Sequence, residues 1–403
     1  MTINLETPKK FKVLSEQAHT VAQEVLRPIS RHYDRAEHAY PKELDMLASL
    51  IDGMNESGST LGAGASGVKS SASTETQNRN GSNMSSAIGV METCWGDVGL
   101  VLSMPRQGLG NAAIAAVANE DQLLRYEGSW AAMAITEPES GSDSASIRTT
   151  AILDGDEYVL NGEKIYVTAG ERAELVVVWA TLDPKQGRAA IKSFVVERSN
   201  PGMILDRLEH KLGIRASDTA AFRLENCRVP KEDLLGTPEI DMKRSFAGVM
   251  KTFDNTRPLV AAMAVGVAQA SLDRTRELLT EAGIEVDYDR HAHSQPAAAA
   301  ALLELESDLE AARLMMMEAA WMADNSKPNS LHASMSKAKA GRVGVDISLR
   351  CVELCGSLGY DESELLEKWA RDAKILDIFE GTQQIQQLII ARLLLGKTSA
   401  DLR

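Results

Sequence analysis

The run ELVVVWAT at residues 174–181 shows that the centre of this chain forms β-strands, because β-branched and aromatic side chains fill nearly every position. Similar runs lie on both sides of it, with turn residues between them: AAMAIT at 131–136, IKSFVVE at 191–197 and TAAFRLE at 219–225. The dipeptides Asp154-Gly155 and Asn161-Gly162 accept a positive φ and predict hairpin turns. We therefore expect a middle domain of largely antiparallel strands that ends near Gly236.

Helical periodicity precedes and follows this β region. Before it, we expect an amphipathic helix from Phe11 that Pro28 stops, a second over Pro41–Ile51, and a third over Met84–Val117 that is broken near Pro105. After it, long segments rich in Ala and Leu predict a helical bundle: Leu259–Leu279, Pro296–Asp324, Ser330–Leu354 and Ile385–Leu395.

The fold class predicted from this order is α+β multidomain. The expected parts are an N-terminal helical domain (1–128), a middle antiparallel β-barrel-like domain (129–240) and a C-terminal four-helix bundle (241–403). Residues 53–86 are rich in Gly, Ser, Asn and Thr and predict a long mobile loop.

Composition restricts the partners. The chain has 403 residues and a formal net charge of −14, so we expect neither a nucleic-acid nor a membrane partner. No window is apolar enough for a membrane span and the first residues do not resemble a signal peptide, which favours a cytoplasmic location. Cys351 and Cys355 lie in an apolar helical pattern, so packing is favoured and no metal site is expected. His291 and His293 are expected to face solvent.

Three segments could carry chemistry. Thr136–Asp143 leaves a strand and enters a turn whose N–H groups and hydroxyls could hold a ring edge or a phosphate, although such residues also dominate ordinary turns. Tyr166–Gly170 places an aromatic ring and a hydroxyl on one strand face, where a simple packing pair is the alternative. In Ile378–Thr382, Glu380 lies between apolar residues and a glycine. Desolvation there would make Glu380 a stronger base, whereas a helix N-terminal charge is the alternative.

Together these segments closely resemble the acyl-CoA dehydrogenase family over nearly the whole chain. The family motifs T-E-P-x-x-G-S-D, aromatic-x-T, D-x-x-R-P, R-D-A-K-I and E-G-T-x-Q-I-Q match residues 136–143, 166–168, 254–258, 371–375 and 380–386 in the same order. The resemblance implies an FAD-dependent enzyme that converts an acyl-CoA to the trans-2-enoyl-CoA, with electron-transfer flavoprotein as electron acceptor. Glu380 would take the α-proton while the β-hydride passes to FAD.

The same resemblance assigns the remaining site residues. The backbone N–H of Glu380 and the flavin ribityl chain would hold the thioester carbonyl, and hence the developing enolate. Residues implied to bind the cofactor are Met133, Ile135, Thr136, Gly141, Ser142, Tyr166, Thr168, Thr382, Gln384 and Ile385. Residues implied to bind the substrate are Ser142, Asp254, Arg257 and Gly381, although a salt bridge at the helix start is the alternative role for Arg257.

The chain departs from the family in two places. The R-x-x-F-G stretch, with which homomeric members grip the neighbouring subunit's FAD, is replaced by an acidic stretch with Ile284 and Asp287 at its key positions. The family's Q-x-x-G-G reads Glu353-Leu354-Cys355-Gly356-Ser357. Both losses predict a hetero-oligomer, such as a heterotetramer, in which a homologous chain supplies the FAD diphosphate contacts. Heteromeric actinobacterial members, some acting on steroid side-chain thioesters, are the implied type.

Two other functions remain open from the residues. The chain could be a non-catalytic scaffold subunit, against which the retained Glu380 and the turn at 136–143 argue. It could also be an acyl-CoA oxidase, whose reduced flavin reacts directly with oxygen.

Overall fold

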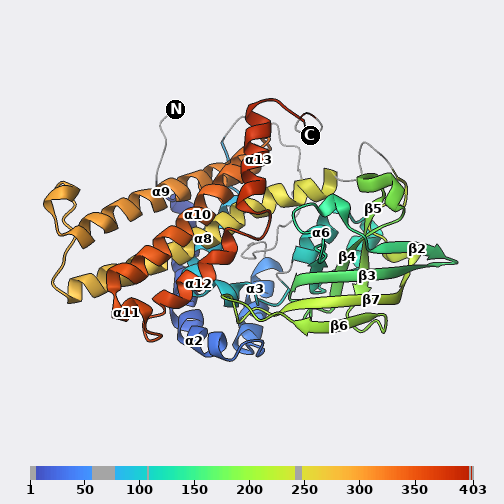
Figure 1. Ribbon diagram of the computed structural model, residues 1–403, viewed down its shortest axis with the longest axis horizontal. Helices are drawn as coiled ribbons and strands as arrows, with labels where there is room; N and C mark the ends of the chain where they lie inside the picture. The colour runs from blue at the N-terminus through green and yellow to red at the C-terminus, as the bar shows by residue number, and fades with distance from the viewer. Residues whose placement is uncertain (1–5, 57–77, 107–108, 241–246, 399–400, 402–403) are drawn as a thin grey trace.

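The computed structural model describes residues 6–56, 78–106, 109–240, 247–398 and 401; the side chains of 50–56 and 247–255 are outside this description. Helices at both ends of the chain pack together on one side, and a curled sheet lies on the other (Figure 1). The molecule is therefore of the α+β class. Among the described residues, no helix combines the length and apolar character of a membrane span.

Helices form the first part of the chain. They are α1 (Lys12–Val21), α2 (Arg27–Arg35), α3 (Glu43–Glu56), α4 (Ser82–Gly96), α5 (Val98–Val101), α6 (Leu109–Val117) and α7 (Glu120–Arg125). The prediction that Pro28 stops the first helix is wrong. A π-helical stretch, Ala22–Leu26, joins α1 to α2, and Pro28 lies in the first turn of α2, where a missing N–H is tolerated.

The expected loop at 53–86 is partly wrong, since α3 runs to Glu56 and α4 begins at Ser82. Most of that segment, 57–77, lies outside the described residues. Where α4 begins, the Asp324 carboxylate accepts hydrogen bonds from the backbone N–H groups of Gly81, Asn83 and Met84. This carboxylate satisfies N–H groups that would otherwise lack partners at the helix end.

In the described part of the chain, seven strands form the sheet: β1 (Ala131–Ala134), β2 (Thr150–Asp154), β3 (Glu157–Thr168), β4 (Leu175–Thr181), β5 (Ile191–Glu197), β6 (Met203–Leu208) and β7 (Thr219–Pro230). The strand order is β1-β4-β2-β3-β7-β6, with β5 paired to β4. Four pairings are antiparallel, as expected: β2 with β3, β3 with β7, β4 with β5, and β6 with β7. The parallel pairing of β4 with β1 and with β2 was not expected. The hairpin of β2 and β3 lies in the connection between β1 and β4, and such a crossover permits parallel pairing.

The two predicted hairpin turns have different outcomes. Gly155, with φ 66°, joins the antiparallel strands β2 and β3 as expected. Asn161-Gly162 is not a turn. It lies within β3, where the register with β7 shifts, and the extended strand tolerates Gly162 at φ 154° as a bulge. A side chain there would meet Thr149, whose Oγ1 would be 2.4 Å from the added Cβ.

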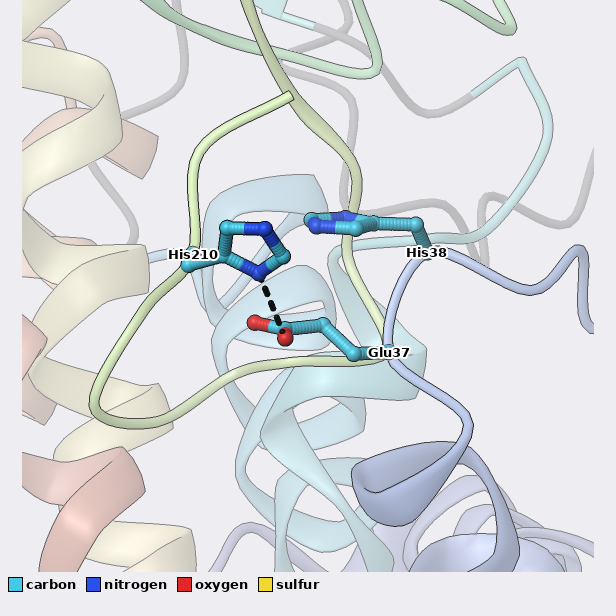
Figure 2. A group of neighbouring side chains, drawn as sticks. All are labelled: Glu37, His38 and His210. Carbon is cyan, nitrogen blue, oxygen red and sulfur yellow. Dashed lines mark hydrogen bonds and ion pairs between the residues drawn. The ribbon is translucent and has the colours of Figure 1, made fainter. Parts of the chain in front are cut away.

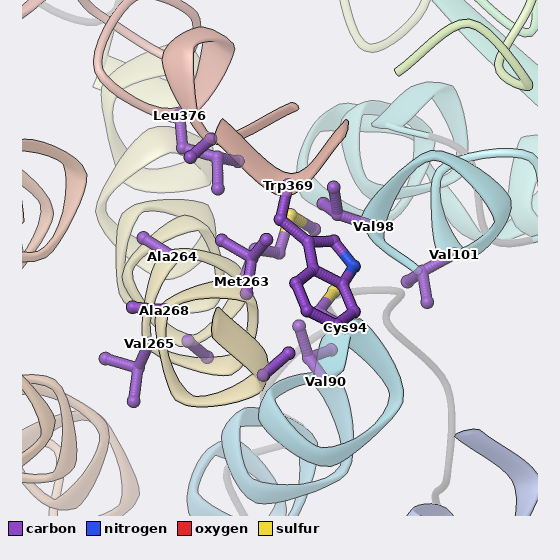
Figure 3. Packing of buried hydrophobic residues seen from close by; sticks show 14 of the residues in the cluster. Val90, Cys94, Val98, Val101, Met263, Ala264, Val265, Ala268, Trp369 and Leu376 are labelled. Carbon is purple, nitrogen blue, oxygen red and sulfur yellow. The ribbon is translucent and has the colours of Figure 1, made fainter. Parts of the chain in front are cut away.

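The last part of the chain is helical: α8 (Ala247–Glu281), α9 (Ala297–Asp324), α10 (Ser330–Cys355), α11 (Ser357–Tyr360), α12 (Leu366–Leu376) and α13 (Gln383–Leu394). Helix α8 begins earlier than predicted, with Pro258 inside it, and α12 was not predicted. The main apolar core joins these helices to α4, where Val90 and Cys94 pack with Trp369 and residues of α8 (Figure 3). Cys351 belongs to this core, which confirms its predicted packing role.

Candidate active site

Glu380 occupies a tight turn between α12 and α13. Its φ is 55°, in the left-handed region that non-glycine residues rarely adopt, and Gly381 follows with φ 89°. Thr382 then caps α13, because its hydroxyl accepts the N–H of Ile385 at 3.3 Å. The turn therefore holds the Glu380 side chain in one direction at a conformational cost, as is common at functional sites.

Side chains from distant parts of the chain hold this turn. The Thr256 hydroxyl in α8 donates to Glu380 Oε2 at 3.0 Å. Lys337 in α10 donates to the Gly381 carbonyl at 2.8 Å, and the Gln386 side-chain amide donates to the carbonyls of Glu380 and Gly381 at 3.1 and 3.0 Å. Helices α8, α10 and α13 thus fix the position of the carboxylate.

The electrostatics favour a base of raised strength. Burial raises the pKa of Glu380, and the Thr256 hydrogen bond and the charges of Arg257 and Lys337 only partly offset this. Burial also lowers the pKa of Lys337 to about 8 against the opposing charges of Asp377 and Glu380. The whole Glu380 residue nevertheless retains some solvent exposure. Its carboxyl group is therefore desolvated but reachable, which suits proton transfer from a bound molecule.

The predicted substrate residues are divided between the two parts of the molecule. Arg257 is 3% exposed, and its Nη1 lies 3.5 Å from the Ser334 hydroxyl. Asp254 lies in the segment of α8 whose side chains are not described. Gly381 adjoins the carboxylate, whereas Ser142 lies in the exposed turn after β1. Arg257 is therefore buried, and its charge acts on Glu380.

The predicted cofactor residues of the sheet come together along β1 and β3. The Ile165 N–H donates to the Thr136 carbonyl at 2.9 Å, which joins the end of β1 to β3. Met133 and Ile135 are half-buried against Trp179, and the Tyr166 ring is 62% exposed. Thr168 is half-buried, while Gly141 and Ser142 are exposed. The remaining three, Thr382, Gln384 and Ile385, lie at the start of α13.

A buried ion pair supports the turn at 136–143. Glu137 Oε1 lies 2.7 Å from Lys164 Nζ, and the same carboxylate accepts the N–H groups of Arg148 and Thr149 at 2.6 and 3.0 Å. Burial alone would raise the pKa of Glu137, but Lys164 and these donors lower it overall. The buried contacts of Glu137 therefore fix the turn, while the other side of the turn stays exposed.

Several of these residues were not predicted as site residues. Thr256, Lys337 and Gln386 support Glu380, and Lys164 supports the turn. Thr256 lies 124 residues before Glu380, so only the folded chain brings them together. Two signals were available: Thr256 is inside the matched D-x-x-R-P segment, and Gln386 ends the matched E-G-T-x-Q-I-Q segment.

A cavity of about 770 Å³ lies apart from these residues. It is lined by residues of α1, the π-helical stretch, α2, α4 and α8, among them His19, Arg27, Trp95 and Asp273. None of the predicted site residues lines it. The candidate site is therefore defined by Glu380 and its partners, and not by this cavity.

Comparisons with known proteins agree with the motifs. Residues 246–395 match the family model of the acyl-CoA dehydrogenase C-terminal domain. Residues 132–227 match the family model of the acyl-CoA dehydrogenase middle domain. The mitochondrial short-chain specific acyl-CoA dehydrogenase of Rattus norvegicus is 32% identical over 397 residues, covering 96% of this chain and 90% of that protein. The probable acyl-CoA dehydrogenase fadE25 of Mycobacterium bovis is 37% identical over 278 residues, covering 68% of each chain.

Solved structures show the same likeness. Butyryl-CoA dehydrogenase from Megasphaera elsdenii has a TM-score of 0.78 at 26% identity, covering 98% of this chain and 100% of that one. A glutaryl-CoA dehydrogenase in complex with glutaryl-CoA has a TM-score of 0.82 at 25% identity, covering 99% and 98%. The chain belongs to the acyl-CoA dehydrogenase family, whose members are FAD-dependent oxidoreductases.

The residues of the sheet fit a flavin. Met133 and Ile135 are half-buried apolar side chains, and Tyr166 is exposed. Thr136 and Thr168, which carry hydroxyl groups, are close to these residues in the chain. Apolar surface for a ring system, bordered by a few polar groups, is what a flavin ring requires.

Proposed function

We propose that this chain catalyses the α,β-dehydrogenation of an acyl-CoA thioester to the trans-2-enoyl-CoA, with Glu380 as the base. The observation that carries the proposal is the desolvated Glu380 carboxylate. It accepts a hydrogen bond from the Thr256 hydroxyl at 3.0 Å, and the Glu380 backbone is left-handed within a tight turn. Family membership supports the same reaction, because the rat, Megasphaera and Mycobacterium relatives are named acyl-CoA dehydrogenases.

The chain's own groups would perform the proton transfer. An α-C–H is a very weak acid, so Glu380 can remove its proton only if donors stabilise the enolate that forms at the thioester oxygen. Among the described residues, the Glu380 N–H donates to no backbone or side-chain acceptor, so it is available to that oxygen. Gly381 and the buried Arg257 border the same space on the substrate side, and Asp254 and Ser142 are proposed to contact the CoA portion.

FAD, when bound, accepts the hydride from the β-carbon. We assign its ring to the side chains of Met133, Ile135 and Tyr166, with Thr136, Gly141, Ser142 and Thr168 as polar contacts. Thr382, Gln384 and Ile385 are assigned to the dinucleotide end, since they begin a helix of 12 residues and a helix N-terminus favours phosphate.

This assignment implies three domains, 1–128, 129–240 and 241–403, with a barrel-like middle domain and a C-terminal four-helix bundle. The ends of α7 at Arg125 and of the 3₁₀ turn at Asp233 support the boundaries. We propose electron-transfer flavoprotein as the acceptor. A chain in the structure of the electron transferring flavoprotein of Acidaminococcus fermentans has a TM-score of 0.79 at 29% identity to this chain, and this likeness supports the proposal.

We also propose a hetero-oligomer, on the basis of the segment that replaces the family's R-x-x-F-G. Its polar groups are used internally: the Gln295 side chain accepts the Asp287 N–H and donates to the Asp287 carbonyl, both at 2.8 Å. The Tyr288 hydroxyl donates to the Glu306 carboxylate at 3.0 Å. Ile284 packs against the core. Because this segment is acidic and its side chains bond within the same chain, it is poorly suited to bind the diphosphate of a neighbouring subunit's FAD.

The experiment that tests the proposed reaction compares wild type with Glu380→Gln. We expect enoyl-CoA formation to fall by about 10²- to 10⁴-fold, while the flavin absorbance per chain stays unchanged. Glu318→Gln, at a glutamate with 58% side-chain exposure on α9, is the matched control. Substrates should span short acyl-CoAs and steroid side-chain thioesters. Undiminished turnover in Glu380→Gln would refute the assignment, and turnover with oxygen alone as acceptor would identify an oxidase.

A further inference from the structure

Glu37, His38 and His210 meet where the loop after α2 approaches the loop after β6 (Figure 2). Their candidate ligand atoms all lie within 4.8 Å of one another. Glu37 Oε2 is 2.9 Å from His210 Nδ1. Two imidazoles and a carboxylate at this separation form the usual ligand set of a three-residue zinc site.

His38 supplies a second, independent observation. Both of its ring nitrogens are buried and have no hydrogen-bond partner among the described residues. Its ring centroid lies 5.3 Å from that of His210, and its φ of 71° is left-handed. Buried imidazole nitrogens normally find partners, so a strained backbone that holds both unpaired beside another histidine indicates a missing ligand.

The neighbouring cations already have other partners. Lys211 Nζ donates to the Ser217 carbonyl at 2.8 Å. Arg172 pairs with Asp218 at 3.3 Å and donates to the carbonyls of His38 and Ala39 at 3.1 and 2.9 Å. Among the described residues, neither cation forms an ion pair with Glu37, whose carboxylate contacts His210 and the Lys211 N–H.

We propose that Glu37, His38 and His210 bind one divalent transition-metal cation, with Zn²⁺ the best match and water in the fourth position. Ligand atoms around tetrahedral zinc lie roughly 3.3 Å apart. The ligand atoms must therefore move closer together, and the His210 side chain has room to do so because it is 83% exposed. The ion would join the N-terminal helices to the sheet. It would also steady the loop that reaches α12, where the Ile214 N–H donates to Asp372 at 2.5 Å.

The test is calorimetric titration of the chelator-stripped full chain with Zn²⁺, followed by the absorption spectrum of the Co²⁺-loaded protein. We expect one ion per chain, a tetrahedral Co²⁺ spectrum and a higher melting temperature with Zn²⁺. We expect Zn²⁺ binding to weaken by about 10- to 100-fold in each of three variants: His210→Ala, Glu37→Gln and His38→Asn. Asparagine is chosen because it tolerates the left-handed backbone at position 38.

The matched control is the double variant His291→Ala, His293→Ala. This pair is exposed and stacked, with ring centroids 5.4 Å apart. The control should bind Zn²⁺ as wild type does. The proposal is overturned if wild type binds no ion, if the site variants bind as tightly as wild type, or if only the control loses binding. Melting temperatures without metal show whether each variant folds. Because the His210 side chain is exposed, His210→Ala should fold normally, and its Zn²⁺ affinity then tests the site even if the other two variants do not fold.

Discussion

At the scale of the residue, the Thr256 hydroxyl is the group that tunes Glu380. Its hydrogen bond at 3.0 Å favours the ionised carboxylate and so restrains the rise in pKa that burial causes. A base must be ionised to act, so kcat/KM should rise with pH through the raised pKa of Glu380. In Thr256→Val this rise should move to higher pH by about one unit, because a hydrogen bond to a charged group is lost.

The pH profile of kcat/KM measures this shift, and Thr256→Ser is its control because serine keeps the hydroxyl. An unchanged profile in Thr256→Val would show that the hydrogen bond does not control the ionisation of Glu380.

At the same scale, the limits of sequence reasoning are visible. Glu380 could be found because the motif around it is continuous in the chain. The buried Lys337 could not, since an isolated lysine in a helical pattern predicts a solvent-facing position, whereas the fold encloses it against the Gly381 carbonyl. The grouping of Glu37, His38 and His210 was not predicted for a related reason: His210 is far from Glu37 in the chain.

At the scale of the element, close contact between α4 and α8 depends on Gly266. A Cβ at this position would lie 2.2 Å from the Met91 carbonyl oxygen. Gly266→Ala should therefore lower the free energy of unfolding by about 1–3 kcal/mol, since backbone must move to relieve the clash. Gly89→Ala is the control on α4, because a Cβ there meets nothing within 4 Å.

Chemical denaturation of both variants measures these effects. Gly89→Ala should gain up to about 1 kcal/mol from helix propensity. Equal stability of Gly266→Ala and wild type would contradict the described packing of these helices (Figure 3).

The buried ion cluster on α12 makes a second prediction at this scale. Lys368 Nζ lies 2.7 Å from Asp97 and 2.5 Å from Asp372. Although burial opposes it, these carboxylates raise the pKa of Lys368. Lys368→Met leaves two buried carboxylates unpaired and should lower the free energy of unfolding by roughly 3–5 kcal/mol.

The control is Lys374→Met on the same helix, where the side chain is 43% exposed and pairs with Asp377 at 3.4 Å. Its effect should stay below about 1 kcal/mol. Comparable losses in the two variants, measured by urea unfolding, would contradict a structural role for the cluster.

At the scale of the whole molecule, the order of helices, sheet and helices was predicted, because hydrophobic period changes from helical to alternating and back along the chain. The parallel pairing in the sheet was not, since β1 and β4 meet across a crossover that leaves no local signal. Asn161-Gly162 resembles a turn locally, but its neighbours continue to pair with β7, and tertiary pairing prevails.

The proposed hetero-oligomer belongs to this scale. Purified alone, the chain should carry little flavin, whereas co-expression with a homologous chain that retains R-x-x-F-G should yield about one FAD per pair of different chains. Absorbance spectra and protein quantitation measure the ratio. One FAD per chain in the isolated protein would refute the split arrangement without affecting the role of Glu380.

The most direct test of the central claim follows α-proton exchange in D₂O, by NMR, with an acyl-CoA analogue whose β-carbon is replaced by sulfur. This analogue can lose its α-proton but cannot donate a β-hydride. The flavin-loaded wild type should exchange the α-proton, and Glu380→Gln should slow the exchange by about 10²- to 10⁴-fold. Exchange at the wild-type rate in Glu380→Gln would contradict the assignment of Glu380 as the base.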